Sequence, residues 1–443
     1  MIPRRTDFVK IAAFLFLILS LFCKGTAFGK VYIDIDSPTF RQFPIAITDF
    51  ERAEGPGSSP ENISSWFPDT LADSLRLTGF FNPLNKKAFL EDKITSGKVP
   101  GSIAFGDWMA IGAEYLVKGN YSIRGGEIEA DFRLFDVVKG ELLTAMSYKG
   151  RSEDRKAMVL GFAGEILLAL TGEKGVFNTK IAFVNKEGKT SQIYTVNFDG
   201  SGLAKIVNHR SIVMAPRWSP DGRRLSFTSY KDGKPDLYIT ELGGGATRKV
   251  SGFDGINLSG SWSPDGKRIL LTLSKDGDAE IYLLDLENGL LKRLTYQFSI
   301  DVSPAWSPDG LKIVFVSDRS GSPQIYIMDA DGTNVKRLTY EGNYNTSPSW
   351  SYKGNRITYE GLTNRNYQIF SIDTDGNDLR QLTFDEGDHE SPSWSPDGRY
   401  IVFGWVKSGK SEIHVMNANG TNRRLLYKNG GGSTGVAWSP RLE

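Results

Sequence analysis

The chain has 443 residues, with 53 lysine and arginine residues, 52 aspartate and glutamate residues and a single cysteine, Cys23. This length exceeds what one hydrophobic core usually serves, so we expect two domains. The formal net charge of +1 gives no strongly basic surface, which excludes nucleic acid as an expected partner.

Residues 1–29 have the composition of a secretory signal peptide. The basic start MIPRRTDFVK precedes the apolar run IAAFLFLILSLF, and small residues then favour cleavage after Ala27 or Gly29. A membrane anchor is one alternative, but a span needs about 20 apolar residues, and Lys24 ends this run early. A lipid-modified Cys23 is another, although Phe22 precedes it where a small residue is usual. We expect an exported protein with no membrane span after cleavage, and with no cysteine for disulfides or thiol catalysis if cleavage follows Cys23.

Residues 30–172 are predicted to form an α/β domain with an extended N-terminal arm. The arm, KVYIDID, alternates apolar and polar side chains, and PIAITDF at 44–50 predicts a strand. Pro68 and Gly79 mark the expected start and end of a helix.

Three strands and a helix are expected in the rest of this domain. The alternating runs at 113–123, 127–137 and 141–151 predict the strands. A helix then begins after Ser152 and ends at Gly172. Its apolar stripe is Val159, Phe162, Ile166 and Leu170. Residues 171–179 are the expected linker.

The pentapeptide WSPDG recurs through the second half of the chain, at a spacing of 44 residues. Complete copies begin at Trp218, Trp262, Trp306 and Trp394, and altered copies begin at Trp350 and Trp438. A period of roughly 40 to 45 residues is typical of the four-stranded blades of a propeller. Each unit contains four short runs separated by Gly, Asp, Asn and Pro, which predicts four antiparallel strands.

The motif itself is interpreted as a turn. Proline presets φ at its first central position, and glycine accepts the positive φ of the exit. The aspartates of the motif are therefore expected to be turn residues and not catalytic ones. They are Asp221, Asp265, Asp309 and Asp397.

The two ends of the repeat complement each other. Lys174 stands 44 residues before Trp218, so the first unit lacks its tryptophan strand, whereas the unit at Trp438 has only that strand. We predict a mainly β fold in which residues 173–443 form a six-bladed β-propeller closed by the C-terminal strand. A ring closed in this way leaves no long exposed edge.

The histidines and short motifs of the sequence predict no catalytic residue, no cofactor and no metal site. The three histidines are His209, His389 and His414, and the last stands in a column of Tyr and Phe. The GGSTG at 431–435 matches a hydrolase elbow but has no histidine after it. The DTDGND at 373–378 places its glycine fourth and not sixth, so it is interpreted as a hairpin turn and not as a calcium loop.

A polar column stands five residues before each tryptophan. It consists of Asn257, Asp301, Asn345, His389 and Ser433, with Val213 in the first unit. Equivalent places in a propeller lie on one face, so we expect a polar ring there. The alternatives are a ring of solvated loops and a partner site with apolar anchors inside a polar rim. The anchors would be Ile256, Leu258, Ile300, Val302 and Tyr344.

Signal peptide, α/β domain and repeat together resemble the TolB family, the periplasmic propellers of the bacterial Tol–Pal system. VYIDID, PIAITDF and LADSLRLTGFFNPL carry the resemblance outside the repeat. The repeat alone also resembles propellers of prolyl-oligopeptidase-like and tricorn-like proteases, which carry an added hydrolase domain. The resemblance implies a monomeric, non-catalytic scaffold in the periplasm that supports outer-membrane integrity and cell division.

The resemblance also implies two partners. The N-terminal segment would bind a TolA-like inner-membrane protein, and the propeller face would bind the peptidoglycan-associated lipoprotein Pal. The TolA-like site would be Lys30, Val31, Tyr32, Ile33, Asp34, Ile35 and Asp36. The Pal-like site would be Ile256, Asn257, Leu258, Ser259, Ile300, Asp301, Val302, Tyr344, Asn345 and His389. A periplasmic hydrolase, or a protein that binds a small ligand or glycan at the channel mouth, is the alternative.

Overall fold

The structure is a computed structural model that describes residues 41–53, 63–89, 103–428 and 432–442. The expected signal peptide, Cys23 and the arm Lys30–Asp36 lie outside the described residues. No helix within the described ranges is long and apolar enough to span a lipid bilayer.

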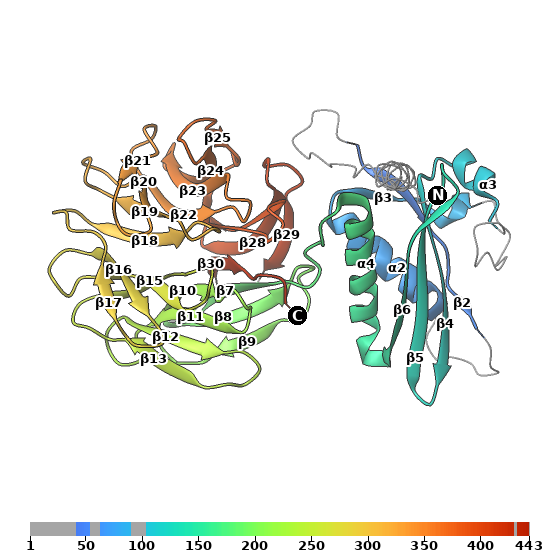
Figure 1. Cartoon of the computed structure of the whole chain (residues 1–443), viewed down its shortest axis with the longest axis horizontal. Helices are drawn as coiled ribbons and strands as arrows, with labels where there is room; N and C mark the ends of the chain where they lie inside the picture. Colours follow the sequence, from blue (N-terminus) through green and yellow to red (C-terminus); the bar gives the residue numbers. More distant parts are fainter. Residues whose placement is uncertain (1–40, 54–62, 90–102, 429–431, 443) are drawn as a thin grey trace, which may run out of the picture.

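The N-terminal part is a mixed sheet covered on one face by two helices (Figure 1). The sheet order is β3-β1-β4-β5-β6, with β2 beside β4. The strands are β1 (Phe43–Ile47), β2 (Glu51–Arg52), β3 (Phe81–Pro83), β4 (Tyr115–Arg124), β5 (Glu127–Asp136) and β6 (Glu141–Arg151). The helices are α2 (Ile63–Leu77), α3 (Phe105–Ala110) and α4 (Arg155–Thr171), with 3-10 turns at Lys86–Ala88 and Ser152–Asp154.

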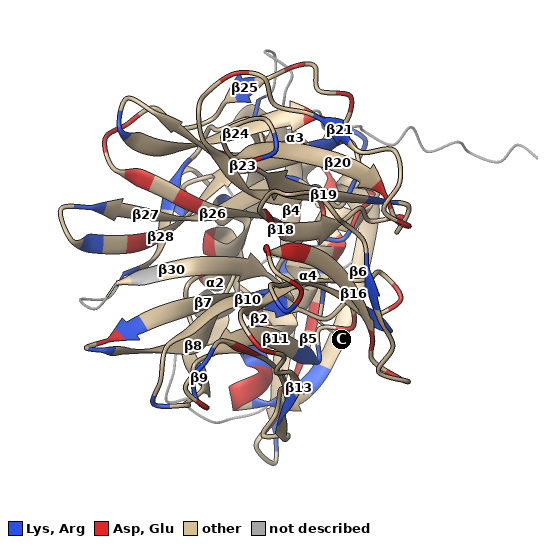
Figure 2. Cartoon of the chain, turned by 90° about the vertical axis from the view of Figure 1, so that its left-hand side faces the viewer, with Lys and Arg blue, Asp and Glu red and all other residues tan. Residues whose placement is uncertain are grey.

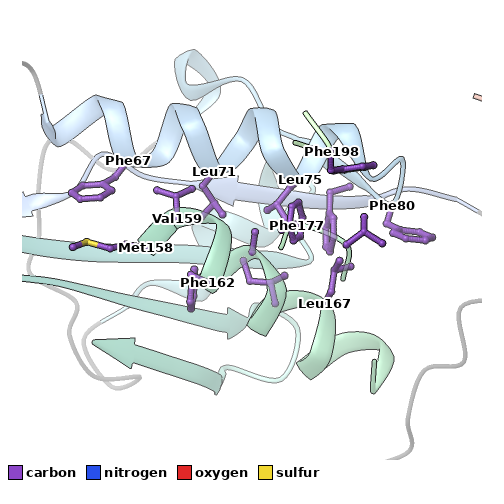
Figure 3. Packing of buried hydrophobic residues seen from close by; sticks show 14 of the residues in the cluster. Phe67, Leu71, Leu75, Phe80, Met158, Val159, Phe162, Leu167, Phe177 and Phe198 are labelled. Carbon is purple, nitrogen blue, oxygen red and sulfur yellow. The ribbon is translucent and has the colours of Figure 1, made fainter. Parts of the chain in front are cut away.

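Helix α4 confirms its predicted stripe, because Val159, Phe162, Ile166 and Leu170 are all buried. They share one core with Phe67, Leu71 and Leu75 of α2 (Figure 3).

The predicted start of the other helix at Pro68 is wrong, since α2 begins five residues earlier, at Ile63. A proline inside a helix leaves the carbonyl four residues before it without its N–H partner. Here that carbonyl belongs to Ser64, and it accepts the N–H of Phe50 at 2.9 Å. The loop before the helix therefore replaces the lost hydrogen bond.

The repeat forms six four-stranded antiparallel sheets around a common centre (Figure 1). The inner strands are β30 (Ser433–Trp438), β10 (Val213–Trp218), β14 (Asn257–Trp262), β18 (Asp301–Trp306), β22 (Asn345–Trp350) and β26 (Asp388–Trp394). The second strands are β7 (Lys180–Glu187), β11 (Arg224–Ser229), β15 (Arg268–Leu273), β19 (Lys312–Ser317), β23 (Arg356–Thr363) and β27 (Tyr400–Lys407).

The two outer strands of each sheet complete the blades. The third strands are β8 (Thr190–Asn197), β12 (Asp236–Glu241), β16 (Glu280–Asp285), β20 (Gln324–Asp329), β24 (Asn366–Asp373) and β28 (Lys410–Asn417). The outermost strands are β9 (Ala204–Val207), β13 (Thr247–Ser251), β17 (Leu291–Arg293), β21 (Lys336–Arg337), β25 (Arg380–Gln381) and β29 (Arg424–Lys428).

The predicted closure is confirmed by one sheet of order β30-β7-β8-β9. Its inner strand comes from the C-terminal end of the chain, with Trp438 opposite Ile181 and Ser433 opposite Asn185. The edge that β7 would otherwise expose is thereby paired.

Each tryptophan of the repeat is buried between two blades. The indole Nε1 of Trp218 donates to the carbonyl of Ala437 in the neighbouring blade at 3.0 Å, and that of Trp262 donates to Ser226 at 3.1 Å. The interpretation of the motif as a turn is confirmed too. Asp309 accepts the Ser307 hydroxyl at 2.5 Å and the N–H of Leu311 at 3.0 Å, and Gly310 has a φ of 71°.

The N-terminal core continues into the interface between the last and first blades. Phe198 and Trp438 lie in the same apolar cluster as α2 and α4 (Figure 3). Tyr400 joins them, and its hydroxyl donates to the carbonyl of Thr78 at 2.7 Å. The 44-residue column of Tyr400 holds Arg224, Arg268, Lys312 and Arg356 in other blades. The blade that contacts the N-terminal part thus has a tyrosine at a position where these other blades have a lysine or an arginine. The division into residues 30–172 and 173–443 stays a prediction.

Deleting residues 433–443 should lower the melting temperature of the protein, produced without residues 1–29, by at least about 10 °C. The deletion removes an inner strand and a tryptophan whose truncation alone costs about 3 to 5 kcal/mol in a core. Deleting only residues 441–443, which retains β30, is the control and should change the melting temperature by much less. Circular dichroism against temperature makes the measurement, and equal melting of both truncated proteins would contradict the closure.

Candidate functional site

The predicted polar column lies at the starts of the inner strands, but it is buried. Asn257, Asp301, Asn345 and His389 have at most 2% of their surface exposed. The alternative of a ring of solvated loops is therefore wrong for these four residues. Sequence cannot distinguish these residues from solvated loop residues, because buried polar groups that are hydrogen-bonded have the same residue types.

Each of these side chains fixes the connector that enters its inner strand. Asn257 accepts from Ser251 at 2.7 Å and from the N–H of Phe253 at 3.0 Å. Asn345 donates to Gln324 and to the carbonyl of Glu341, both at 2.9 Å.

Two members of the column have charged partners. Asp301 accepts from Arg319 at 2.8 Å. His389 Nε2 lies 3.1 Å from both Asp385 and Arg423, and burial lowers the pKa of this imidazole. These contacts hold the starts of the inner strands and engage Asp301 and the Nε2 of His389 inside the protein.

Of the predicted Pal-like contacts, the apolar ones are the accessible ones. Ile300 and Tyr344 are 50% and 39% exposed, and Ile256, Leu258 and Val302 are half-buried. Ser259 is buried, and its hydroxyl lies 3.0 Å from that of Ser226. A partner could touch Ile300 and Tyr344 directly, but not Ser259 or the four buried members of the column.

Sequence reasoning missed four strongly exposed aromatic residues in the same connectors, which we call the aromatic rim: Tyr296, Phe298, Tyr340 and Phe384. Tyr296, Tyr340 and Phe384 recur at 44 residues, so the repeat held a signal that could have found them. Arg293 and Arg337 each lie 4.9 Å from the ring centre of the tyrosine three residues on. Exposed apolar groups gathered on one face are typical of interaction sites.

The rim lies on the face where the inner strands begin, which we call the column face. In Figure 2 the column face lies at the left, where the tip of the β27–β28 hairpin and the start of β26 are seen. The C-terminus lies on the opposite side. The opposite face carries the Ser-Pro-Asp-Gly turns, and we call it the turn face. The N-terminal part meets the turn face at Tyr400, so the column face is not covered by it.

The pair His209 and Ser229 does not form an accessible nucleophilic site of the hydrolase type. His209 Nδ1 lies 2.9 Å from the hydroxyl of Ser229, but that serine is completely buried. A substrate carbonyl could not reach it. No cluster of three or more metal-ligating His, Cys, Asp or Glu side chains occurs among the described residues.

Two family models match the chain. The TolB beta propeller domain matches residues 168–442, and the TolB amino-terminal domain matches residues 31–143. The chain belongs to the TolB family.

Relatives and a solved structure agree with this assignment. "Tol-Pal system protein TolB" from Syntrophus aciditrophicus is 49% identical over 219 residues, 48% of the length of each chain. The protein of that name from Desulfosudis oleivorans is 40% identical over 224 residues, 50% of this chain and 51% of the relative. The chain thus spans about half the length of the curated TolB relatives it matches. The crystal structure of TolB from Acinetobacter baumannii is 28% identical with a TM-score of 0.79, covering 90% of this chain and 97% of that one.

One buried carboxyl of this TolB-family protein has a strongly shifted pKa. Glu360 of β23 accepts the N–H of Ser391 in β26 and the hydroxyl of Ser347 in β22. Only 6% of this residue is exposed, and burial raises the pKa of its carboxyl to about 7.

Glu360 should make the protein less stable as the pH rises. Between pH 4.5 and about 7 the native carboxyl holds its proton while the unfolded one has lost it, so the free energy of unfolding falls through this window. Glu360→Gln cannot ionise and should be about 3 kcal/mol more stable than the wild type at pH 8, with no such gain at pH 4.5. Urea unfolding measures this, with exposed Glu287→Gln as control. A gain independent of pH would contradict the assignment.

Proposed function

We propose that the protein is a non-catalytic periplasmic scaffold of the Tol–Pal system. Its column face binds a Pal-like lipoprotein, and residues 30–36 bind a TolA-like inner-membrane protein. Membership of the TolB family and the exposed aromatic rim on the uncovered face support the first site. The second site rests on the family resemblance, since Lys30–Asp36 lie outside the described residues.

The rim has the anatomy expected of a protein-binding surface. Aromatic anchors contribute most of the binding energy in such interfaces, and neighbouring residues mainly exclude water. Phe298 is fully exposed and Ile300 is 50% exposed, so both can enter a partner's pocket. The buried Asp301 beneath them, paired with Arg319, fixes the strand from which they project.

The double substitution Phe298→Asp with Ile300→Asp should weaken binding to the Pal-like lipoprotein at least about tenfold. Both residues are exposed, so the melting temperature should stay close to the wild-type value. Leu311→Asp is the matched control, because Leu311 is 66% exposed and follows the Ser-Pro-Asp-Gly turn on the turn face. Isothermal titration with the soluble lipoprotein domain gives the affinities. Wild-type affinity of the double variant would contradict the placement of the site.

Removing residues 30–36 should abolish binding to a TolA-like domain while leaving the Pal-like affinity unchanged. The proposal places the two partners on different surfaces, so this deletion should affect the binding of only one of them. A pulldown with each purified partner domain makes the comparison. Retention of the TolA-like partner by the shortened protein would exclude the arm as its site.

A further inference from the structure

A cavity of about 360 Å³ lies where the inner strands end, on the turn face of the channel. Tryptophans from all six blades line it, together with prolines of the turns and Tyr352. A concave space of this volume, lined by aromatic and proline rings and by several serine hydroxyls, is typical of a small-molecule site.

One position of the cavity wall differs from its equivalents. The residue before each tryptophan lines the cavity in all six blades, and the 44-residue column reads Arg217, Ser261, Ala305, Ser349, Ser393 and Ala437. Five of these side chains are small and one is an arginine. A cation therefore enters a space that the other blades leave open.

Arg217 has no carboxylate beside it. Among the described residues it forms no ion pair, and its Nη1 donates to the carbonyl of Pro216 at 3.1 Å. Arg217 is half-buried in the cavity wall, and desolvation lowers the pKa of its guanidinium. Glu360 acts on Arg217 electrostatically without forming an ion pair with it. A guanidinium carries five N–H donors in a fork that fits a carboxylate, so the donors of Arg217 can bind one that a ligand supplies.

Serine hydroxyls on the same wall can complete an anion site. The hydroxyl of Ser261 accepts the N–H of Trp306 at 2.8 Å, and that of Ser393 accepts the N–H of Trp438 at 3.0 Å. A hydroxyl that accepts one hydrogen bond still has its own O–H to donate.

We propose that this cavity binds an apolar organic carboxylate, with the carboxylate on Arg217 and the apolar portion against the tryptophan and proline rings. The single cation of the lining and the tryptophan and proline rings favour a singly charged carboxylate with an apolar portion over phosphate. This site lies on the turn face and is independent of the two protein-binding sites proposed above.

Glu360 should make the affinity depend on pH. It stands on β23, in the blade opposite that of Arg217, and the two interact electrostatically. Asp388 and Glu390 on β26 face Glu360, and their negative charges help to raise the pKa of its carboxyl. The charge of Glu360 in turn helps to raise the pKa of Tyr367 on β24. When Glu360 loses its proton, it adds negative charge to the channel and competes for Arg217.

The probe is 3-phenylpropionate, with 3-phenylpropionamide and inorganic phosphate as comparisons, titrated into the full exported protein and followed by calorimetry and tryptophan fluorescence. We expect the acid to bind at least tenfold more tightly than the amide or phosphate. Arg217→Met should abolish this preference, and Arg217→Lys should retain part of it. Arg268→Met is the control, because Arg268 does not line the cavity and pairs with Asp265.

The affinity of the wild type for the acid should fall severalfold between pH 6 and pH 8. In Glu360→Gln this fall should be absent. Unchanged circular dichroism of each variant confirms its fold. Equal affinity for acid and amide, tighter binding of phosphate, no binding of the acid at millimolar concentration, or a preference that survives in Arg217→Met would each overturn the proposal.

Discussion

The pairing of β30 with β7 is the interaction on which the rest of this molecule depends. It joins residues about 250 positions apart and turns six sheets into a ring in which every inner strand has a neighbour on both sides. A strand at the edge of a sheet presents unpaired N–H and carbonyl groups, and closure removes that edge. The entropy lost in closing so long a loop grows only slowly with its length. The inter-blade contacts of Trp438 and its neighbours offset it.

Closure also determines where the N-terminal part sits. Five interfaces between blades have their own apolar clusters, each built around one or two tryptophans. The sixth interface, where the chain ends meet, shares its cluster with α2 and α4. Tyr400 and Phe198 make this joint apolar, and Lys156 adds an ion pair with Asp199 at 2.6 Å. The joint lies at the turn face, so the column face stays open for a partner.

The repeat made most of the propeller predictable. A strict spacing of 44 residues, with a missing strand at one end and a spare strand at the other, specified both the number of blades and the closure. Pro68 misled the helix prediction, because the structure supplies a partner for the carbonyl of Ser64 from Phe50. That contact joins segments distant in sequence, and local propensity contains no information about it.

The candidate site was predicted less well than the fold, for a physical reason. Asn257 and Asp301 look like loop residues in the sequence, yet they are buried and bonded to the connectors. Three residues of the aromatic rim were visible as a recurrence at 44 residues, and Arg217 was visible as a departure within its 44-residue column. Their meaning depends on exposure and on the absence of an ion pair among the described residues, which only the folded chain shows.

Native-state hydrogen exchange of the protein, produced without residues 1–29, tests the ring most directly. Amides of Ile181–Asn185 in β7 should open with the same free energy, within about 1 kcal/mol, as those of Ile313–Ser317 in the equivalent strand β19, because both strands are paired on both sides. If the β7 amides instead exchange through local fraying, at a free energy far below that of β19, the C-terminal strand does not close the ring.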